Sequence, residues 1–429
     1  MDEASSGSGG APAHDALDLV LRHEYGRVVA ALLREFGGAR LALIEDGLAQ
    51  AMLEALGAWT REMPPSPRAW LHRAARHRII DELRRARRFA SEAPLEDEPA
   101  SSAEVPDAAL SDDVHDDELR ALYACADPSI PLPSQIAFAL RTLAGFSTRE
   151  IAARLVTSEE NVQKRYERAR EGLRQVDFSL EPTGEALRAR TDAVLRMLYV
   201  LFTEGYFASS GDAVLKLELC REAIRLTALV AAHPRLGSRE ALALLALMHL
   251  HHARRDARVD ASGKPVLLED QDRRAYRQDE LLLGLRLLQR ASASETGEVV
   301  LSSSHHLEAA IAAEHGFAPS FAATRWEVIT QLYDRLAEVS PSPLHALHAA
   351  VAASYASGPD AGLARLSQLR PPTWLAGSHL WLATHADLEA RAGRLEEARA
   401  HYDQAIALAP PIERHVLELR RDARTRGDG

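Results

Sequence analysis

The stretch that decides the fold is SPRAWLHRAARHRIIDELRRARRF, at residues 66–89. Ser66 suits the cap of a helix and Pro67 its first turn, because the N–H groups there have no partner within the helix. At 100° per residue, five apolar side chains share one face of such a helix: Leu71, Ala75, Ile79, Leu83 and Ala86. The pattern predicts a long amphipathic helix that packs by this face on a helical core.

The opposite face of the predicted helix is basic and carries an aromatic side chain. Residues 68–90 contain eight Arg against two acids, in a chain whose net charge is −11. A basic, aromatic-bearing face in an acidic protein is typical of a surface that binds a polyanion. For this helix alone, an Arg-rich face that simply meets solvent remains the alternative.

A second amphipathic segment, LALIEDGLAQAMLEALGAW at residues 41–59, precedes the basic helix. Together the two resemble region 2 of the sigma-70 family, in its extracytoplasmic-function (ECF) group, over residues 15–91. The most specific part is the Ala-Trp-Leu, Ala-Arg and Asp-x-x-Arg-Arg pattern of residues 69–85. The resemblance implies that the basic helix opens the promoter −10 element and reads it as a single strand. Eight residues are the implied DNA contacts: Trp70, Arg73, Arg76, His77, Asp81, Arg84, Arg85 and Arg88.

The resemblance also implies a polymerase contact on the helix at residues 41–59. In ECF factors the corresponding helix grips the coiled-coil clamp of the RNA polymerase β′ subunit. The family pattern has an amide three residues after the Asp, where this chain has Ala49, and Gln50 follows one residue later. The alternative is an ordinary solvated helix face. The implied polymerase-binding residues are Glu45, Asp46, Gln50 and Glu54.

Two segments of the N-terminal half have the composition of flexible chain. Residues 1–14 are small and acidic, which predicts a disordered tail. Residues 92–118 hold eleven acids, no Lys or Arg and three Pro. Such a segment buries too little apolar area to fold, so it is interpreted as an acidic linker. It is either a pure tether or a competitor of DNA for the basic helix.

Residues 119–180 have the pattern of a helix followed by a helix-turn-helix. Ser147 and Glu150 form a capping box, and a second cap is provided by Thr157 with Glu160 or by Ser158 directly. Two short capped helices joined by a tight turn are typical of a DNA-binding motif whose second helix enters the major groove. Its candidate contacts to bases and phosphates are Ser158, Asn161, Gln163, Lys164, Arg165 and Arg168.

This second segment resembles sigma region 4, which implies recognition of the promoter −35 element. Val156 stands where many helix-turn-helices have Gly, so the turn is expected to take another form. Regions 2 and 4 in this order predict a sigma factor whose partners are promoter DNA and the RNA polymerase core, through its β′ clamp and β subunit. A one-component helix-turn-helix regulator with a C-terminal sensor and a tetratricopeptide (TPR)-type scaffold are the alternatives.

The remaining residues predict further helices that an ordinary ECF factor lacks. A helical extension is expected at 185–340 and TPR-like repeats at 341–425. Small, aromatic and terminating residues follow TPR-like spacing near the end: Gly393, Ala398, Tyr402, Ala405 and Pro410. A subset of ECF factors carries such an extension. A concave repeat surface favours a protein or peptide partner, so the extension is expected to regulate activity in cis or through that partner.

Composition sets the outer limits. Aromatic residues make up 5% of the chain and β-branched runs are nearly absent, so the fold class is all-α. The two Cys match no metal spacing, and no apolar run is long enough for a membrane span, which predicts a cytoplasmic protein without a membrane partner. His249 and His252 share a helix face without a carboxylate at a recognisable spacing. No catalytic residue, cofactor or metal is predicted.

Overall fold

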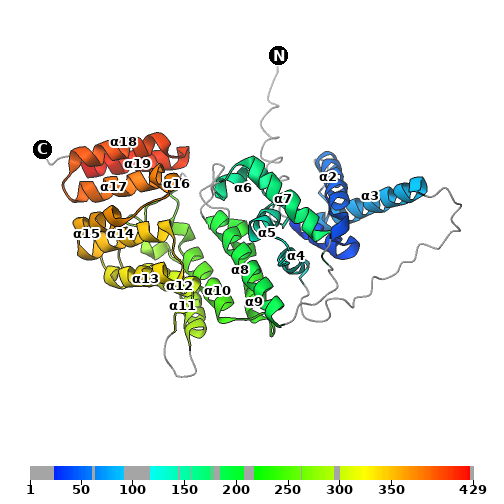
Figure 1. Ribbon diagram of the computed structural model, residues 1–429, viewed down its shortest axis with the longest axis horizontal. Coiled ribbons are helices and arrows are strands. Elements are labelled where there is room, and N and C mark those ends of the chain that lie inside the picture. The colour runs from blue at the N-terminus through cyan, green and yellow to red at the C-terminus, as the bar shows by residue number, and fades with distance from the viewer. Residues whose placement is uncertain are drawn as a thin grey trace, which may run out of the picture. The chain divides into compact units, whose positions relative to one another are not determined.

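Helices make up almost all of the regular secondary structure that the computed structural model describes (Figure 1). The described residues are 24–59, 63–90, 116–143, 145–155, 157–174, 176, 184–206, 217–261, 263–293 and 300–425. Outside the helices, they contain one isolated antiparallel bridge between Val259 and Pro265. The all-α prediction is therefore confirmed. The chain divides into two compact units, Met1–Leu201 and Phe202–Gly429.

The first unit begins with the helices of the predicted region 2. Residues 24–36 are helical, and three elements follow: η1 (Gly38–Arg40), α2 (Leu41–Ala58) and α3 (Pro67–Ala90). Helices α2 and α3 pack closely at Gly47, where an added Cβ would lie 3.1 Å from Ile79 Cγ1 and 3.3 Å from the Ala75 carbonyl. A side chain at position 47 would require the Ile79 side chain or the backbone of α3 to shift.

The predicted apolar face of α3 is shorter than its periodicity indicated. Leu71, Ala75 and Ile79 are fully buried, whereas Leu83 is half-buried and Ala86 is exposed. Figure 1 shows why: the C-terminal end of α3 projects beyond the helices that cover its beginning. The expectation for Ala86 is wrong because periodicity cannot show where a partner helix ends.

The second half of the first unit contains the helix-turn-helix. Asp116 caps its first helix by accepting from the Leu119 N–H, so this helix begins two residues before the position expected from sequence. The elements are α4 (Asp117–Cys125), α5 (Leu132–Phe138), a π-helical turn η2 (Ala139–Leu143), α6 (Thr148–Arg154) and α7 (Glu159–Leu173). The first part of α8 (Gly184–Tyr206) joins α4 through a 3.0 Å hydrogen bond from Tyr123 to Thr191 Oγ1.

Both helices of the motif are capped by their own sequence. The Ser147 N–H donates to the Glu150 carboxylate while the Glu150 N–H donates to Ser147 Oγ, a complete capping box. Ser158 caps α7 directly by accepting from the Asn161 N–H at 3.2 Å. The predicted helix-turn-helix is confirmed, with residues 155–158 between α6 and α7. Val156 lies outside the described residues.

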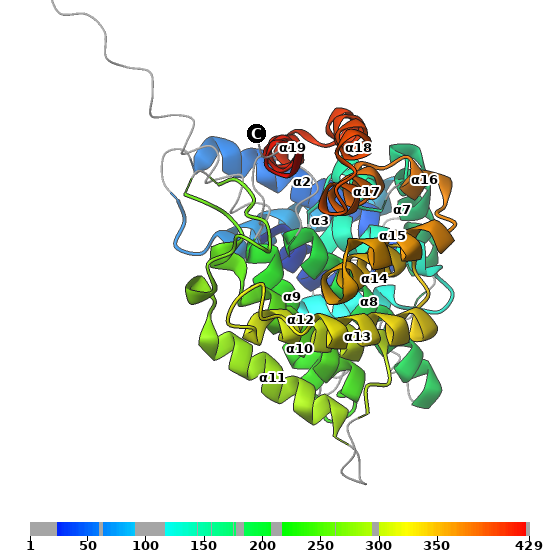
Figure 2. The same ribbon diagram turned by 90° about the vertical axis from the view of Figure 1, so that its left-hand side faces the viewer.

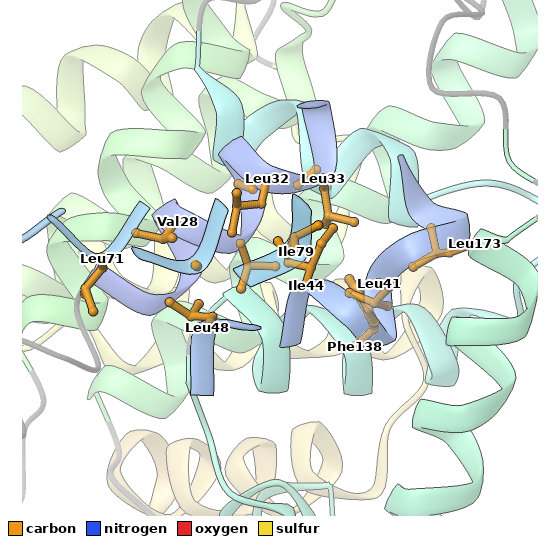
Figure 3. Packing of buried hydrophobic residues seen from close by; sticks show 14 of the residues in the cluster. Val28, Leu32, Leu33, Leu41, Ile44, Leu48, Leu71, Ile79, Phe138 and Leu173 are labelled. Atoms are coloured by element: carbon orange, nitrogen blue, oxygen red, sulfur yellow. The ribbon is translucent and has the colours of Figure 1, made fainter. Parts of the chain in front are cut away.

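One hydrophobic core runs through both halves of the first unit. It contains side chains from α2 and α3 together with Ile130, Phe138 and Leu173 of the second half. Figure 3 shows Leu41, at the start of α2, close to Phe138 and Leu173. The two segments that sequence separates by an acidic stretch therefore share buried apolar surface, and this burial favours a closed arrangement.

The second unit is a succession of packed helices (Figure 2). Its most buried helix is α10 (Arg239–His252), which packs on α9 (Leu217–Ala232), α11 (Gln278–Ser292) and α12 (Ser304–Phe317). The short elements η3 (Arg255–Ala257) and η4 (Arg273–Ala275) lie between α10 and α11. The later helices are α13 (Trp326–Val339), α14 (Pro343–Ser357), α15 (Pro359–Gln368), α16 (Thr373–Ala376), α17 (His379–Arg391), α18 (Leu395–Leu408) and α19 (Pro411–Thr425).

The end of this unit, where the sequence predicts TPR-like repeats, consists of short packed helices. Gly358 and Gly393, at φ 95° and 79°, lie in the connections between α14 and α15 and between α17 and α18. A side chain would be strained at these φ values, which is why glycine stands there. Ala398, Tyr402 and Ala405 of α18 are fully buried. No described helix in the chain combines the length and apolar character needed to cross a membrane.

Candidate nucleic-acid interface

An open cleft of about 480 Å³ lies along the N-terminal half of α3. Its apolar lining residues are Val28 and Ala31 of the helix at 24–36, and Ala69 of α3. Successive turns of α3 place basic side chains along the cleft. The basic lining residues are Arg68, His72, Arg73, Arg76 and His77. Basic side chains along an open cleft can bind the phosphates of a single strand.

The basic side chains at this cleft are not equally available. Arg76 Nε lies 2.6 Å from Glu35, and His72 lies 3.8 Å from the same carboxylate. Burial lowers the pKa of His72, which leaves it neutral at physiological pH. Arg73 and His77 are exposed and form no ion pair within the described part of the chain. Of the predicted contacts at the cleft, these two are the most accessible to a ligand.

The C-terminal half of α3 presents arginines that pair only with neighbours on the same helix. Arg84 lies 3.9 Å from Asp81 and Arg85 lies 2.9 Å from Glu82. All four side chains are more than half exposed, so these pairs contribute little stability and exchange readily for phosphate. Asp81 is thus a partner of Arg84 in the free protein. Arg88 is exposed as well.

The helical period predicts Trp70 on the polar face of α3. In the structure it lies at the boundary between the polar face and the buried face. Its ring packs edge-on against Trp59, with 5.4 Å between ring centroids and 73° between planes. Trp59 is buried and Trp70 is half-buried. The aromatic pair fixes the position of Trp70, and the ring is only partly covered by the core.

Helix α7 divides into a buried and an exposed face. Val162 and Tyr166 point inward, together with Ala169 and Leu173. The outward face carries the residues predicted to contact the −35 element. Asn161, Gln163, Lys164 and Arg168 are exposed, Arg165 is half-buried, and Ser158 is exposed while it serves as the helix cap.

Gln163 is held by a residue that the sequence reasoning missed. Arg141 Nη1 donates to Gln163 Oε1 at 2.8 Å, and its guanidinium lies 4.3 Å from the centre of the Tyr166 ring. Gln163 in turn donates to Glu167 at 2.8 Å. Arg141 lies in the π-helical turn before the motif, where no spacing rule points to it. Its role as a positioning residue depends on the tertiary contact with α7.

The four residues predicted to bind polymerase separate into two groups on α2. Asp46, Gln50 and Glu54 are four positions apart and form an exposed row. Glu54 forms an ion pair with Arg78 of α3. Glu45 does not belong to this row. It is half-buried and points toward α7.

Glu45 connects α2 to the recognition helix α7. The Tyr166 hydroxyl donates to the Glu45 carboxylate, and Arg170 Nε lies 3.8 Å from its other oxygen. Burial raises the pKa of Glu45 to about 7, although the nearby charges of Arg170 and Arg141 act in the opposite direction. A second ion pair joins the two halves at 3.6 Å, between Arg27 and Glu118.

Comparison with known families decides what these two segments are. Residues 21–89 match sigma-70 region 2, and residues 129–173 match sigma-70 region 4. The chain belongs to the sigma-70 family. This family consists of transcription initiation factors, so the protein has a sigma-factor role in promoter recognition and is not from a catalytic enzyme family. The −10 and −35 assignments of individual residues stay predictions.

The C-terminal half has no characterised counterpart among these matches. Residues 190–292 match a family of unknown function, DUF6596. An uncharacterized protein of Rhizobium meliloti (strain 1021) is 36% identical over 402 residues, which is 92% of each chain. No solved structure matches the chain. The protein is thus an ECF-like sigma factor with a C-terminal helical extension.

The histidines considered as metal ligands have another partner. His252 Nδ1 lies 2.6 Å from Glu280, and His249 lies 3.9 Å from the same carboxylate. Arg255 also reaches Glu280, at 2.6 Å. Among the described residues, no group of three or more His, Cys, Asp or Glu side chains is arranged to hold a metal ion.

Proposed function

We propose that this sigma-70 family protein directs bacterial RNA polymerase to promoters through a −10 and a −35 element and opens the −10 DNA. The observation that carries this proposal is the pair of exposed faces on the matched regions: a basic face on α3, and an outward face of α7 that carries Asn161, Gln163, Lys164 and Arg168. The cleft on α3, with Arg73 and His77 exposed, suits a strand whose bases are unstacked. The outward face of α7 suits the major groove of a duplex.

Polymerase docking is assigned to α2 and region 4. The exposed row of Asp46, Gln50 and Glu54 is available for the β′ clamp, and the β subunit is expected to bind region 4. Glu45 is engaged by Tyr166 and Arg170 in the free chain. Because the −10 and −35 elements are separate stretches of DNA, both regions can bind only after this contact opens. We assign the opening to binding of core polymerase.

The helical extension is assigned a regulatory role, in cis or through a protein partner. Two features support it. The first turns of α8, the helix that continues into the second unit, pack on α4 within the first unit, through Tyr123 with Thr191 and through the ion pair of Arg190 with Asp127. The stacked helices also provide an extended surface of the kind that binds peptides and proteins.

The test is transcription in vitro with core polymerase, with and without this protein, on a template carrying its own upstream region. A sigma factor yields a defined start site and protects the −10 and −35 DNA only when core is present. A one-component regulator would protect duplex DNA without core. Absence of core-dependent initiation on any promoter of a genomic template library would refute the proposal.

A further inference from the structure

A second basic cluster lies in the interior of the second unit, where α10 ends. Arg254 follows α10 and is 8% exposed. Arg273 comes from the short helix η4 (Arg273–Ala275). The two guanidinium carbons lie 5.8 and 5.5 Å from the centre of the same ring, that of Tyr276. His251 at the end of α10 and His315 at the end of α12 both lie within electrostatic reach of Arg254.

The two guanidinium groups have few partners, and those are neutral. Arg254 donates to the side-chain oxygen of Gln271 at 3.0 Å. Arg273 donates to the backbone oxygens of His315 and Ala318, the second at 3.2 Å. Within the described residues, Arg254 Nε and Arg273 Nη2 are buried without a hydrogen-bond partner, and neither arginine forms an ion pair. Burying a cation without a counter-charge is costly.

A neighbouring cluster at the end of α10 contains buried basic side chains that do have an acidic partner. Glu280 accepts from His252 and Arg255 there, and these hydrogen bonds hold the pKa of its carboxyl well below the usual range despite burial. The Arg254 cluster has no equivalent carboxylate in the described part of the chain. The difference points to a counter-charge that comes from outside this set of residues.

The two histidines add neutral polar groups to the cluster. Burial, together with the charge of Arg254, lowers the pKa of both His251 and His315 to about 3. Each imidazole is therefore neutral at physiological pH and can donate one N–H. The Nδ1 atoms of both rings are buried and have no hydrogen-bond partner among the described residues.

We propose that Arg254 and Arg273 form the binding site of a small dianion with phosphate or carboxylate oxygens. Two guanidinium groups can hold such oxygens by charge-assisted hydrogen bonds, with His251 and His315 as further polar groups. Arg273 is half-buried, so the cluster reaches the surface at this residue. Arg273 also contacts the end of α12. A bound anion would therefore stabilise the packing of the DUF6596 segment on the helix that follows it.

The experiment uses the full-length chain in phosphate-free buffer and follows thermal unfolding during titration with inorganic phosphate, and in parallel with malonate. A ligand that binds only the folded state raises Tm with the logarithm of its concentration above Kd. We expect this rise with at least one of the two anions, and the stronger one identifies phosphate or carboxylate chemistry. Arg254→Gln and Arg273→Gln should weaken the response at least tenfold.

Arg274→Gln is the matched control, because Arg274 is adjacent, largely exposed and paired with Asp272. Its response should equal that of the unmodified chain. Arg273→Gln provides the test if Arg254→Gln does not fold. The proposal is wrong if neither anion raises Tm, or if Arg273→Gln and Arg274→Gln respond alike.

Discussion

At the scale of single residues, exposure separates the arginines of α3 that can meet DNA from those already engaged. Arg73 and His77 are open to a ligand at the cleft, whereas Arg76 is held by Glu35 at 2.6 Å. A phosphate must compete with this carboxylate for Arg76. The eight contacts implied by the family resemblance therefore differ in availability, which their spacing in sequence does not show.

The first prediction concerns promoter opening. Arg73→Ala should slow formation of the open complex and leave binding to core polymerase unchanged, because Arg73 lies on the exposed rim of the cleft. Removal of one phosphate-binding side chain should lower the salt-dependence slope for single-stranded −10 DNA by about 0.7. Permanganate footprinting measures the opening. Arg221→Ala, at an exposed arginine of α9, is the control. Normal opening by both Arg73→Ala and His77→Ala would contradict this assignment.

The second prediction concerns the outward face of α7. Asn161→Ala or Lys164→Ala should change the preferred −35 base, because each bidentate pair between a side chain and a base provides about 1–3 kcal/mol of discrimination. Arg168→Gln should instead weaken binding to all sequences alike and flatten its salt dependence, as expected of a residue that binds phosphate. Selection from a randomised −35 library distinguishes the two results. Unchanged base preference for Asn161→Ala would argue against base reading at this position.

At the scale of elements, the contact between α2 and α7 is the feature with the clearest consequence. Glu45 has a pKa of about 7 in this contact, because burial disfavours its charged form. In an open form its pKa returns toward the ordinary value near 4.5. The closed form thus binds more protons between these two values and loses stability as pH rises through 7. Above pH 7 the closed contact has its lowest stability.

The third prediction follows from this linkage. Raising the pH from 6 to 8 should shift the first unit toward the open form, and Glu45→Gln should remove most of that pH dependence. Both native cysteines are buried, so dyes on Ala58→Cys and Glu171→Cys can report the separation of α2 and α7 by energy transfer. Glu159→Gln, at an exposed acid of α7 that does not act on the pKa of Glu45, serves as the control. An equal pH response with and without Glu45 would exclude it as the titrating group.

At the scale of the whole molecule, we expect the extension to change how much core-dependent transcription the protein supports. The fourth prediction is that a chain of residues 1–201, which keeps the contacts of α8 with α4, differs at least severalfold from the full-length protein in core-dependent initiation. The direction shows whether the extension inhibits or activates. The control compares binding of both proteins to core. Equal transcription under every condition tried would mean that the extension is not regulatory.

The sequence by itself determined the helices, their caps and the outward faces of α3 and α7. These depend on interactions within a few residues: the 3.6-residue period, Ser147 with Glu150, and Ser158 with the Asn161 N–H. Local patterns of this kind are visible in one sequence, and the two matched regions follow from them. The buried positions Leu71, Ala75 and Ile79 were predictable for the same reason.

Only the tertiary structure decided which of these side chains meet. Glu45 and Tyr166 are 121 positions apart, so no periodicity on α2 separates Glu45 from the exposed row that begins at Asp46. Arg273 reaches the end of α12 across 42 positions. The exposed end of α3 likewise depends on where other helices stop. Contacts between distant segments form because both segments bury apolar surface against each other. A sequence shows which face of a helix is apolar, but not which other segment packs on it.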